Sequence, residues 1–84
     1  MTVREVTGNL WYSQYILIVP RDKYDVNTFL SIKHMEKVAL FAEENWRLES
    51  VLHKYILDME VQSYGCMDDN SNPNKTWFVI ITKN

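Results

Sequence analysis

The most informative part of the chain runs from His34 to Val51 and reads HMEKVALFAEENWRLESV. Its first half places apolar residues at helical spacing, which predicts an amphipathic helix. Asn45 is expected to end that helix, because asparagine readily adopts the left-handed conformation found at helix ends. Beyond Asn45 the spacing changes to alternation, which predicts a strand with Trp46 and Leu48 on one side. The apolar residues of the helical stripe are Met35, Val38, Ala39 and Ala42.

Two segments on either side of this stretch have the composition of β-strands. The segment from Leu10 to Val19 is rich in aromatic and β-branched residues, and it is followed by Pro20, which cannot donate to a sheet ladder. The segment from Thr76 to Lys83 has the same composition and predicts the last strand. At the amino terminus, Thr2 to Val6 allows either a short edge strand or a loose end.

The segment from Val51 to Tyr64 fits two patterns. Its apolar residues have helical spacing, which allows a second helix from Arg47 to Glu60. They also alternate with polar residues, which predicts a strand with a β-bulge near Val51, and we favour this strand. The next segment, Gly65 to Lys75, is dense in turn-forming residues and predicts a polar loop.

These elements predict a single domain over residues 1–84 of the α+β class. We expect a small antiparallel sheet of three or four strands, with one helix packed on one face and the order β-α-β-β. Asp25 or Asn27 is positioned to cap the helix at its start. The sheet therefore has a helix for only one of its two faces.

Both faces of the predicted sheet are apolar, because its first and last strands carry apolar side chains on both sides. We expect the face without a helix to bind a second copy of the chain, giving a homodimer or a larger homo-oligomer. The alternative is that the amino-terminal segment, or the stretch from Asp25 to Ser31, folds over that face.

Composition and charge exclude several classes of protein. A hydrophobic content of 46% with only two Gly and two Pro excludes a disordered chain. A net charge of −2 creates no field that would attract nucleic acid or an anionic membrane. The single cysteine, Cys66, and the absence of a signal peptide or a long apolar run favour a cytoplasmic protein, in the cytoplasm of the host cell if it is viral.

The segment from Glu43 to Val51 and the closing segment TWFVIITK, from Thr76 to Lys83, resemble a known family of small domains. In this bacterial and phage family of unknown function, a helix ends in Gly-Trp-Glu-Leu-Val-Ser and the last strand is aromatic and β-branched. The resemblance covers Leu10 to Lys83, and it implies the β-α-β-β fold but no catalytic residue. The matching residues are Trp46, Leu48, Ser50 and Val51, whereas Asn45, Arg47 and Glu49 replace glycine, glutamate and valine.

The sequence contains no recognisable catalytic or metal-binding pattern. The spacing of His34, His53 and Cys66 matches no common ligand set, and no base is placed to activate the thiol of Cys66. The acidic stretch that begins with Asp68 and Asp69 lacks the glycine and the terminal glutamate of a calcium loop. We therefore expect no enzyme activity, no metal and no cofactor.

The remaining candidates for function are aromatic and acidic side chains that could contact another molecule. We expect a non-enzymatic protein-binding module that acts as a homo-oligomer, such as a phage or mobile-element protein that inhibits or modulates a host defence protein. The alternative is binding of nucleic acid or a small ligand through an aromatic sheet face, although the interleaved acidic residues disfavour nucleic acid. The candidate residues are Trp11, Tyr12, Tyr15, Trp46, Trp77, Asp68 and Asp69.

Overall fold

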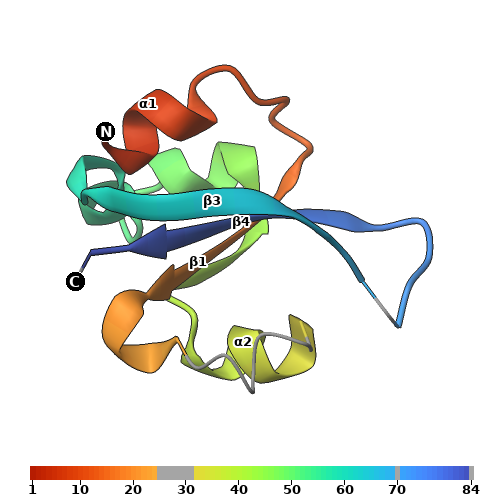
Figure 1. The fold of residues 1–84 in the computed structure, drawn as a ribbon. Coiled ribbons are helices and arrows are strands. Elements are labelled where there is room, and N and C mark those ends of the chain that lie inside the picture. The colour runs from red at the N-terminus through yellow and green to blue at the C-terminus, as the bar shows by residue number, and fades with distance from the viewer. Residues whose placement is uncertain (25–31, 70, 84) are drawn as a thin grey trace.

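The computed structural model describes residues 1–24, 32–69 and 71–83 and contains a four-stranded mixed sheet (Figure 1). The strand order is β2-β1-β4-β3. The central pair, β1 and β4, is parallel, whereas the two outer pairs are antiparallel. The α+β class predicted from the sequence is thus confirmed, whereas the sheet is mixed rather than antiparallel because β1 pairs with β4 in parallel. The strands are β1 (Tyr15–Pro20), β2 (Phe41–Glu44), β3 (Val61–Asp68) and β4 (Thr76–Thr82).

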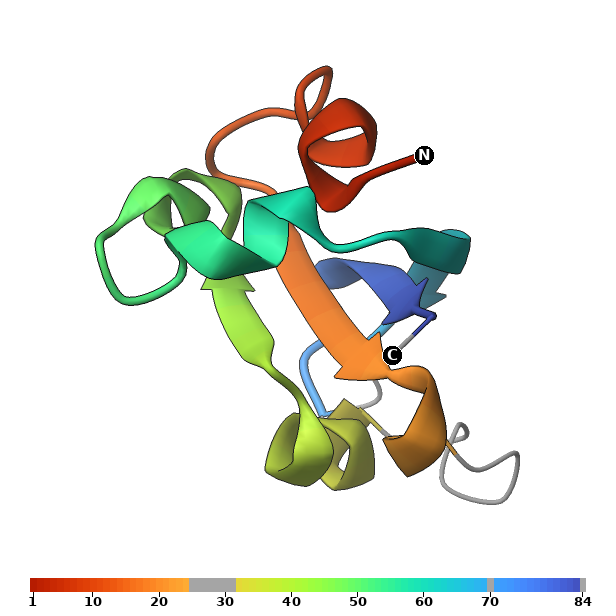
Figure 2. The same cartoon turned by 90° about the vertical axis from the view of Figure 1, so that its left-hand side faces the viewer.

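Helical segments cover both faces of this sheet, as Figures 1 and 2 show. Helix α2 (Ile32–Val38) packs on one face. The other face is covered by helix α1 (Val3–Thr7) together with the 3-10 helices η2 (Asn45–Glu49) and η3 (Lys54–Asp58). A third 3-10 helix, η1 (Arg21–Lys23), follows β1.

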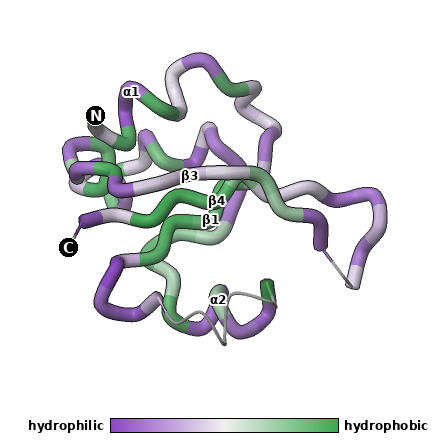
Figure 3. Tube along the Cα trace, in the orientation of Figure 1, coloured by the Kyte–Doolittle hydropathy of each residue, from purple (hydrophilic) through white to green (hydrophobic). Residues whose placement is uncertain are grey.

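Strand β1 contributes to a hydrophobic core on each side of the sheet. Ile16 and Ile18 face the layer formed by α1, η2 and η3, whereas Leu17 and Val19 face α2. All four side chains are fully buried. A strand that is buried on both faces reads as a continuous apolar run, which explains the composition of this segment. Figure 3 shows the same effect as green tube along β1 and β4.

The expectation that one sheet face lacks a cover is wrong. The amino-terminal segment folds over it, which is the alternative that the sequence left open, while the stretch from Asp25 to Ser31 lies outside the described residues. Val3 of α1 is fully buried in the core on that face. The physical reason for self-association through an open sheet face is therefore removed.

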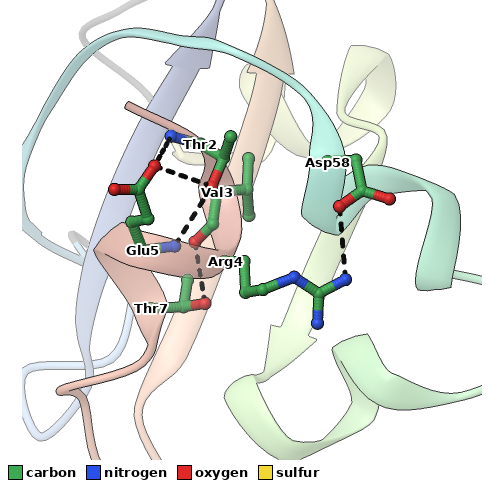
Figure 4. A network of polar contacts seen from close by, with 6 residues as sticks. All are labelled: Thr2, Val3, Arg4, Glu5, Thr7 and Asp58. Atoms are coloured by element: carbon green, nitrogen blue, oxygen red, sulfur yellow. Dashed lines mark hydrogen bonds and ion pairs between the residues drawn. The ribbon is translucent and has the colours of Figure 1, made fainter.

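Helix α1 forms where a strand or a loose end was expected, because its first residues cap it. Thr2 Oγ1 accepts a hydrogen bond from the Glu5 backbone N–H at 3.3 Å, and the Glu5 carboxylate accepts one from the Thr2 N–H at 3.0 Å (Figure 4). Hydrogen bonds from the Thr2 backbone and side chain hold the pKa of Glu5 below its ordinary value. Arg4 also joins α1 to η3 through an ion pair with Asp58 at 3.3 Å.

The central stretch of the sequence also differs from its prediction. The helix ends at Val38 rather than at Asn45, because Phe41 to Glu44 pair with β1 as the edge strand β2. Asn45 begins η2, and no residue of the described part of the chain, glycine included, has a positive φ. The strand expected from Trp46 onward is absent, since this segment forms η2.

The ambiguous segment follows neither of its two predicted patterns throughout. It forms η3 between Lys54 and Asp58, and it becomes the strand β3 only from Val61. Strand β3 then continues to Asp68, into the stretch predicted as a loop. The last strand is confirmed as β4, whereas the residues expected to cap the helix, Asp25 and Asn27, lie outside the described residues.

Candidate functional site

The aromatic residues singled out from the sequence fall into two groups with different surroundings. Trp11, Tyr12 and Trp46 are exposed, with 81%, 73% and 53% of their surface accessible. We refer to these three residues as the aromatic surface. Tyr15 and Trp77 lie on adjacent strands and pack against each other, and Trp77 is only 1% exposed. Only the first group is available to contact another molecule.

The aromatic surface flanks two neighbouring hollows beside α1 and η2. Tyr12 and Trp46 line a hollow of about 250 Å³, together with Leu10. A neighbouring hollow of about 220 Å³ shares Leu10 and Tyr12 and adds Trp11. Because the two hollows share lining residues, the three aromatic side chains belong to one surface.

Asn45 holds the two segments of the aromatic surface together. Its side-chain amide lies within hydrogen-bonding distance of the carbonyl oxygens of Thr7, Leu10 and Trp11, at 3.2, 3.3 and 3.3 Å. Its backbone N–H donates to the Gln14 carbonyl at 2.8 Å. These bonds attach the segment between α1 and β1 to η2.

A direct backbone bond adds to this attachment. The N–H of Trp46 donates to the carbonyl of Tyr12 at 3.1 Å, so two members of the aromatic surface are linked through their main chains. Leu10, which lines the hollow, packs against the buried core. The side chains of Tyr12 and Trp46 therefore project from a backbone that is fixed at several points.

The apolar surface continues past Trp46 into the connection between η2 and η3. A third hollow is lined by Trp46 and Leu52, and Leu52 is exposed. The guanidinium of Arg47 lies 4.5 Å from the centre of the Trp46 ring and 4.0 Å from the Glu43 carboxylate. Sequence reasoning missed the contribution of this connection, because it assigned these residues to a strand. The exposed apolar side chains are Val51 and Leu52 in this connection and Tyr55 in η3.

The second aromatic group forms a closed cluster with charged neighbours. The rings of Tyr15 and Trp77 are 5.3 Å apart, and the Lys75 ammonium lies 4.0 and 4.5 Å from their centres. The indole N–H of Trp77 donates to Asp69 Oδ2 at 3.1 Å. This bond, followed by one from the Ser71 backbone, holds the pKa of Asp69 below its ordinary value. The cluster is structural in character.

Asp68, the remaining candidate, also has a structural partner. Its carboxylate accepts a hydrogen bond from the Thr76 hydroxyl at 3.4 Å across the β3–β4 pair. Tyr15 and Trp77 are likewise engaged within the cluster, so the sheet presents no open pair of rings there on which bases could stack. Tyr15 and Trp77 therefore do not supply the aromatic sheet face that the alternative function requires, whereas Tyr64, exposed on β3, stacks on Phe78 of β4.

The candidates for catalysis and metal binding are dispersed. Cys66 is exposed on β3, whereas the His53 ring lies against Phe41 and 3.0 Å from the Ser50 hydroxyl. In residues 1–24, 32–69 and 71–83 there is no group of three or more His, Cys, Asp or Glu side chains that could hold a metal ion. No helix among the described residues has the length and apolar character needed to cross a membrane.

Comparison of the chain with family models, with curated proteins and with solved structures found no match. The resemblance of Glu43 to Val51 and of the closing strand to a family of small bacterial and phage domains therefore stays a prediction. The function has to be argued from the surface of the molecule itself.

Proposed function

We propose that this chain is a non-enzymatic protein-binding module and that the aromatic surface contacts its partner protein. One observation carries the proposal: Trp11, Tyr12 and Trp46 are exposed on a backbone that Asn45 holds in place. An exposed aromatic ring on a fixed backbone loses little conformational entropy when it enters a complex. Such residues supply much of the binding free energy at protein interfaces.

The chemistry around the hollow favours a protein partner over a nucleic acid. Tryptophan, tyrosine and arginine are the residues most enriched at energetically important interface positions, and Arg47 lies over the Trp46 ring. Arg47 lies 4.0 Å from the Glu43 carboxylate, and the hollow beside Trp46 is lined by Glu49 and by Arg4, which is paired with Asp58. These carboxylates oppose the approach of phosphate groups, whereas a protein surface with apolar and basic side chains is compatible with them.

The biological role that we propose for such a module is inhibition or modulation of a host protein, such as a defence protein, in the cytoplasm. Its support is the aromatic surface, which is exposed on a backbone that Asn45 holds in place. A small protein of this kind acts by occupying a surface of its target.

The proposal is tested by capture from an extract of the native host, followed by affinity measurements with the purified captured protein. We expect the wild-type chain to bind that protein and the Tyr12→Ala/Trp46→Ala double variant to bind it at least about thirtyfold more weakly, since each anchor contributes about 1–2 kcal/mol or more. Tyr64→Ala is the matched control, because Tyr64 is also an exposed aromatic residue but lies on β3. Its affinity should equal that of the wild type.

Two results would contradict the proposal. One is a captured partner whose affinity is the same for the wild type and the double variant. The other is binding of a mixed-sequence single-stranded oligonucleotide that the double variant abolishes, which would support the alternative of nucleic-acid binding.

A further inference from the structure

The two edges of the sheet differ in how they are protected from pairing with another strand. Strand β2 has only four residues, and two of them are Glu43 and Glu44. Strand β3 has eight residues, and its stretch from Gln62 to Met67 contains no charged residue and no proline. Short length, charge and proline are the usual means by which edge strands avoid pairing. The β3 edge has none of them over this stretch.

The outer edge of β3 also presents backbone groups for hydrogen bonding. The Asp69 N–H donates to the Lys75 carbonyl across the β3–β4 pair, so the main-chain groups of Asp69 and Met67 face β4. Because these directions alternate along an antiparallel strand, the N–H and C=O groups of Tyr64 and Cys66 point away from β4. They are placed to pair with an added strand.

The chain itself already pairs with the first part of this edge. Thr2 forms an antiparallel bridge with Glu60, the Val3 N–H donates to the Met59 carbonyl at 3.0 Å, and the Val61 N–H donates to the Met1 carbonyl at 2.8 Å. An antiparallel segment therefore fits along this side of the molecule. The bridge lies at the start of β3, and among residues 1–24, 32–69 and 71–83 no further segment pairs with the outer side of β3 from Gln62 onward.

We infer that this stretch of β3 pairs antiparallel with the same stretch of a second copy of the chain, related to the first by a twofold axis. The edge is self-complementary, because each copy supplies an uncharged extended strand to the other. With the axis at Gly65, residue 68 of one copy lies opposite residue 62 of the other. That arrangement places the carboxylate of Asp68 near Gln62, which accepts a hydrogen bond from Arg21 at 2.7 Å, so opposite charges meet.

The surface beside the edge can receive a side chain from the second copy. A hollow of about 140 Å³ is lined by Ser63, Gly65, Met67 and the β4 residues Val79 and Ile81. Tyr24 also lines this hollow, and a Cβ atom added at Gly65 would meet no atom of the described residues within 4 Å, so the space directly beside Gly65 is open. In the twofold register, Met67 of each copy faces Ser63 of the other and extends along this hollow. The opposite edge, β2, is short and acidic, so pairing stops at two copies.

This dimer is independent of the aromatic surface, because β3 and β2 lie at opposite edges of the sheet and η2 follows β2. The test is the solution mass by light scattering over a range of micromolar concentrations, with a reducing agent present so that no disulfide forms through Cys66. We expect a dimer for the wild type and, for Cys66→Lys, a dimer Kd raised by about tenfold or more, because the two lysines would be diagonal neighbours on the same face of the paired strands and would repel each other.

The matched control is Leu52→Lys, which adds the same charge to an exposed apolar position beside the aromatic surface. It should dimerise like the wild type, and loss of its dimer would overturn the inference. A wild type that stays monomeric, or a Cys66→Lys variant with an unchanged dimer Kd, would also overturn it.

A second measurement does not depend on the folding of any variant. Hydrogen exchange of the wild type should protect the amide protons of Tyr64 and Cys66 at high concentration and release them on dilution, because both point outward in the monomer. Exchange that is independent of concentration would contradict the dimer. An intact dimer combined with unchanged partner binding by the Tyr12→Ala/Trp46→Ala variant would refute the proposed function and leave this inference standing.

Discussion

The buried pair Tyr15 and Trp77 and the exposed residues of the aromatic surface are chemically alike, yet the fold uses them in opposite ways. Trp77 is 1% exposed, its N–H is bonded to Asp69, and its ring is covered by Lys75. Trp46 is 53% exposed, and Asn45 holds the backbone beside it. The comparison teaches that the contacts of an aromatic residue, rather than its type, separate a structural role from a binding role.

The two groups also differ in the kind of segment that carries them. Trp77 lies on β4 at the centre of the sheet, where its side chain faces the core that α2 covers. Trp11 and Tyr12 lie in the turn between α1 and β1, which is attached through its carbonyl groups. Such a turn is held by its main chain, so its side chains are left free to point outward.

The largest expected effect on stability comes from truncating the buried tryptophan, compared with truncating an exposed one. Trp77→Ala should lower the free energy of unfolding by about 3–5 kcal/mol, because it removes a large side chain from the core and leaves a cavity. Trp11→Ala should change it by no more than about 0.5 kcal/mol, as is usual for an exposed position. Urea unfolding of both variants measures the difference. Equal losses would mean that the comparison between buried and exposed rings is wrong.

A smaller effect is expected at the residue that holds the aromatic surface. Asn45→Asp preserves the shape of the side chain but removes its N–H donors, so the carbonyls of Thr7 and Trp11 lose their bonds. We expect the free energy of unfolding to fall by about 1–3 kcal/mol. Thermal unfolding measures it, and Asn72→Asp, in the turn between β3 and β4, is the matched substitution elsewhere. An unchanged midpoint for Asn45→Asp would show that this amide does not hold the segment.

The cation over the buried pair should contribute less. Lys75→Met keeps an unbranched side chain over the rings of Tyr15 and Trp77 but removes the ammonium. We expect a loss of about 1 kcal/mol from the free energy of unfolding, as is typical of a cation close to aromatic rings. Lys54→Met, on η3, controls for the general loss of a surface charge. A loss equal to that of the control would show that the Lys75 ammonium does not stabilise this cluster.

The smallest effect concerns the dependence of stability on pH. The pKa of Asp69 is lower in the folded chain than in the unfolded chain, chiefly because of its bond from Trp77. Its stabilisation is therefore complete above the ordinary aspartate pKa and is lost as the pH falls through the lowered value of the folded state. Asp69→Asn should flatten the stability profile in this acidic range. Denaturant unfolding at several pH values tests this, and an unchanged slope would contradict it.

The sequence was informative about the centre of the sheet and misleading about its surroundings. The aromatic and β-branched composition around Ile16 and Val79 predicted strands that the structure contains as β1 and β4. The helical spacing that begins at Met35 was also correct, but it predicted too long a helix, because the pairing of Phe41 with Ile18 is not visible in local periodicity. Short-range patterns do not report on such distant partners.

For the same reason, the sequence did not show which of the candidate binding residues are exposed. Trp11, Tyr12, Trp46 and Trp77 were singled out together, yet the first three are exposed and Trp77 is buried. The apolar residues near Leu52 were missed, since an alternating pattern placed them in a strand. Composition identifies the aromatic residues but does not show which of them other parts of the chain bury.

The local sequence determined the α+β class and the central strands, because a run of residues such as Ile16 to Val19 can satisfy its apolar side chains only inside a sheet that is covered on both faces. The cover itself was decided by tertiary structure. Helix α1 packs on the sheet because Val3 enters the core, and the turn before β1 is fixed because Asn45 reaches carbonyl groups far away in the chain. These contacts join distant segments, so their energies appear only when the whole chain has folded.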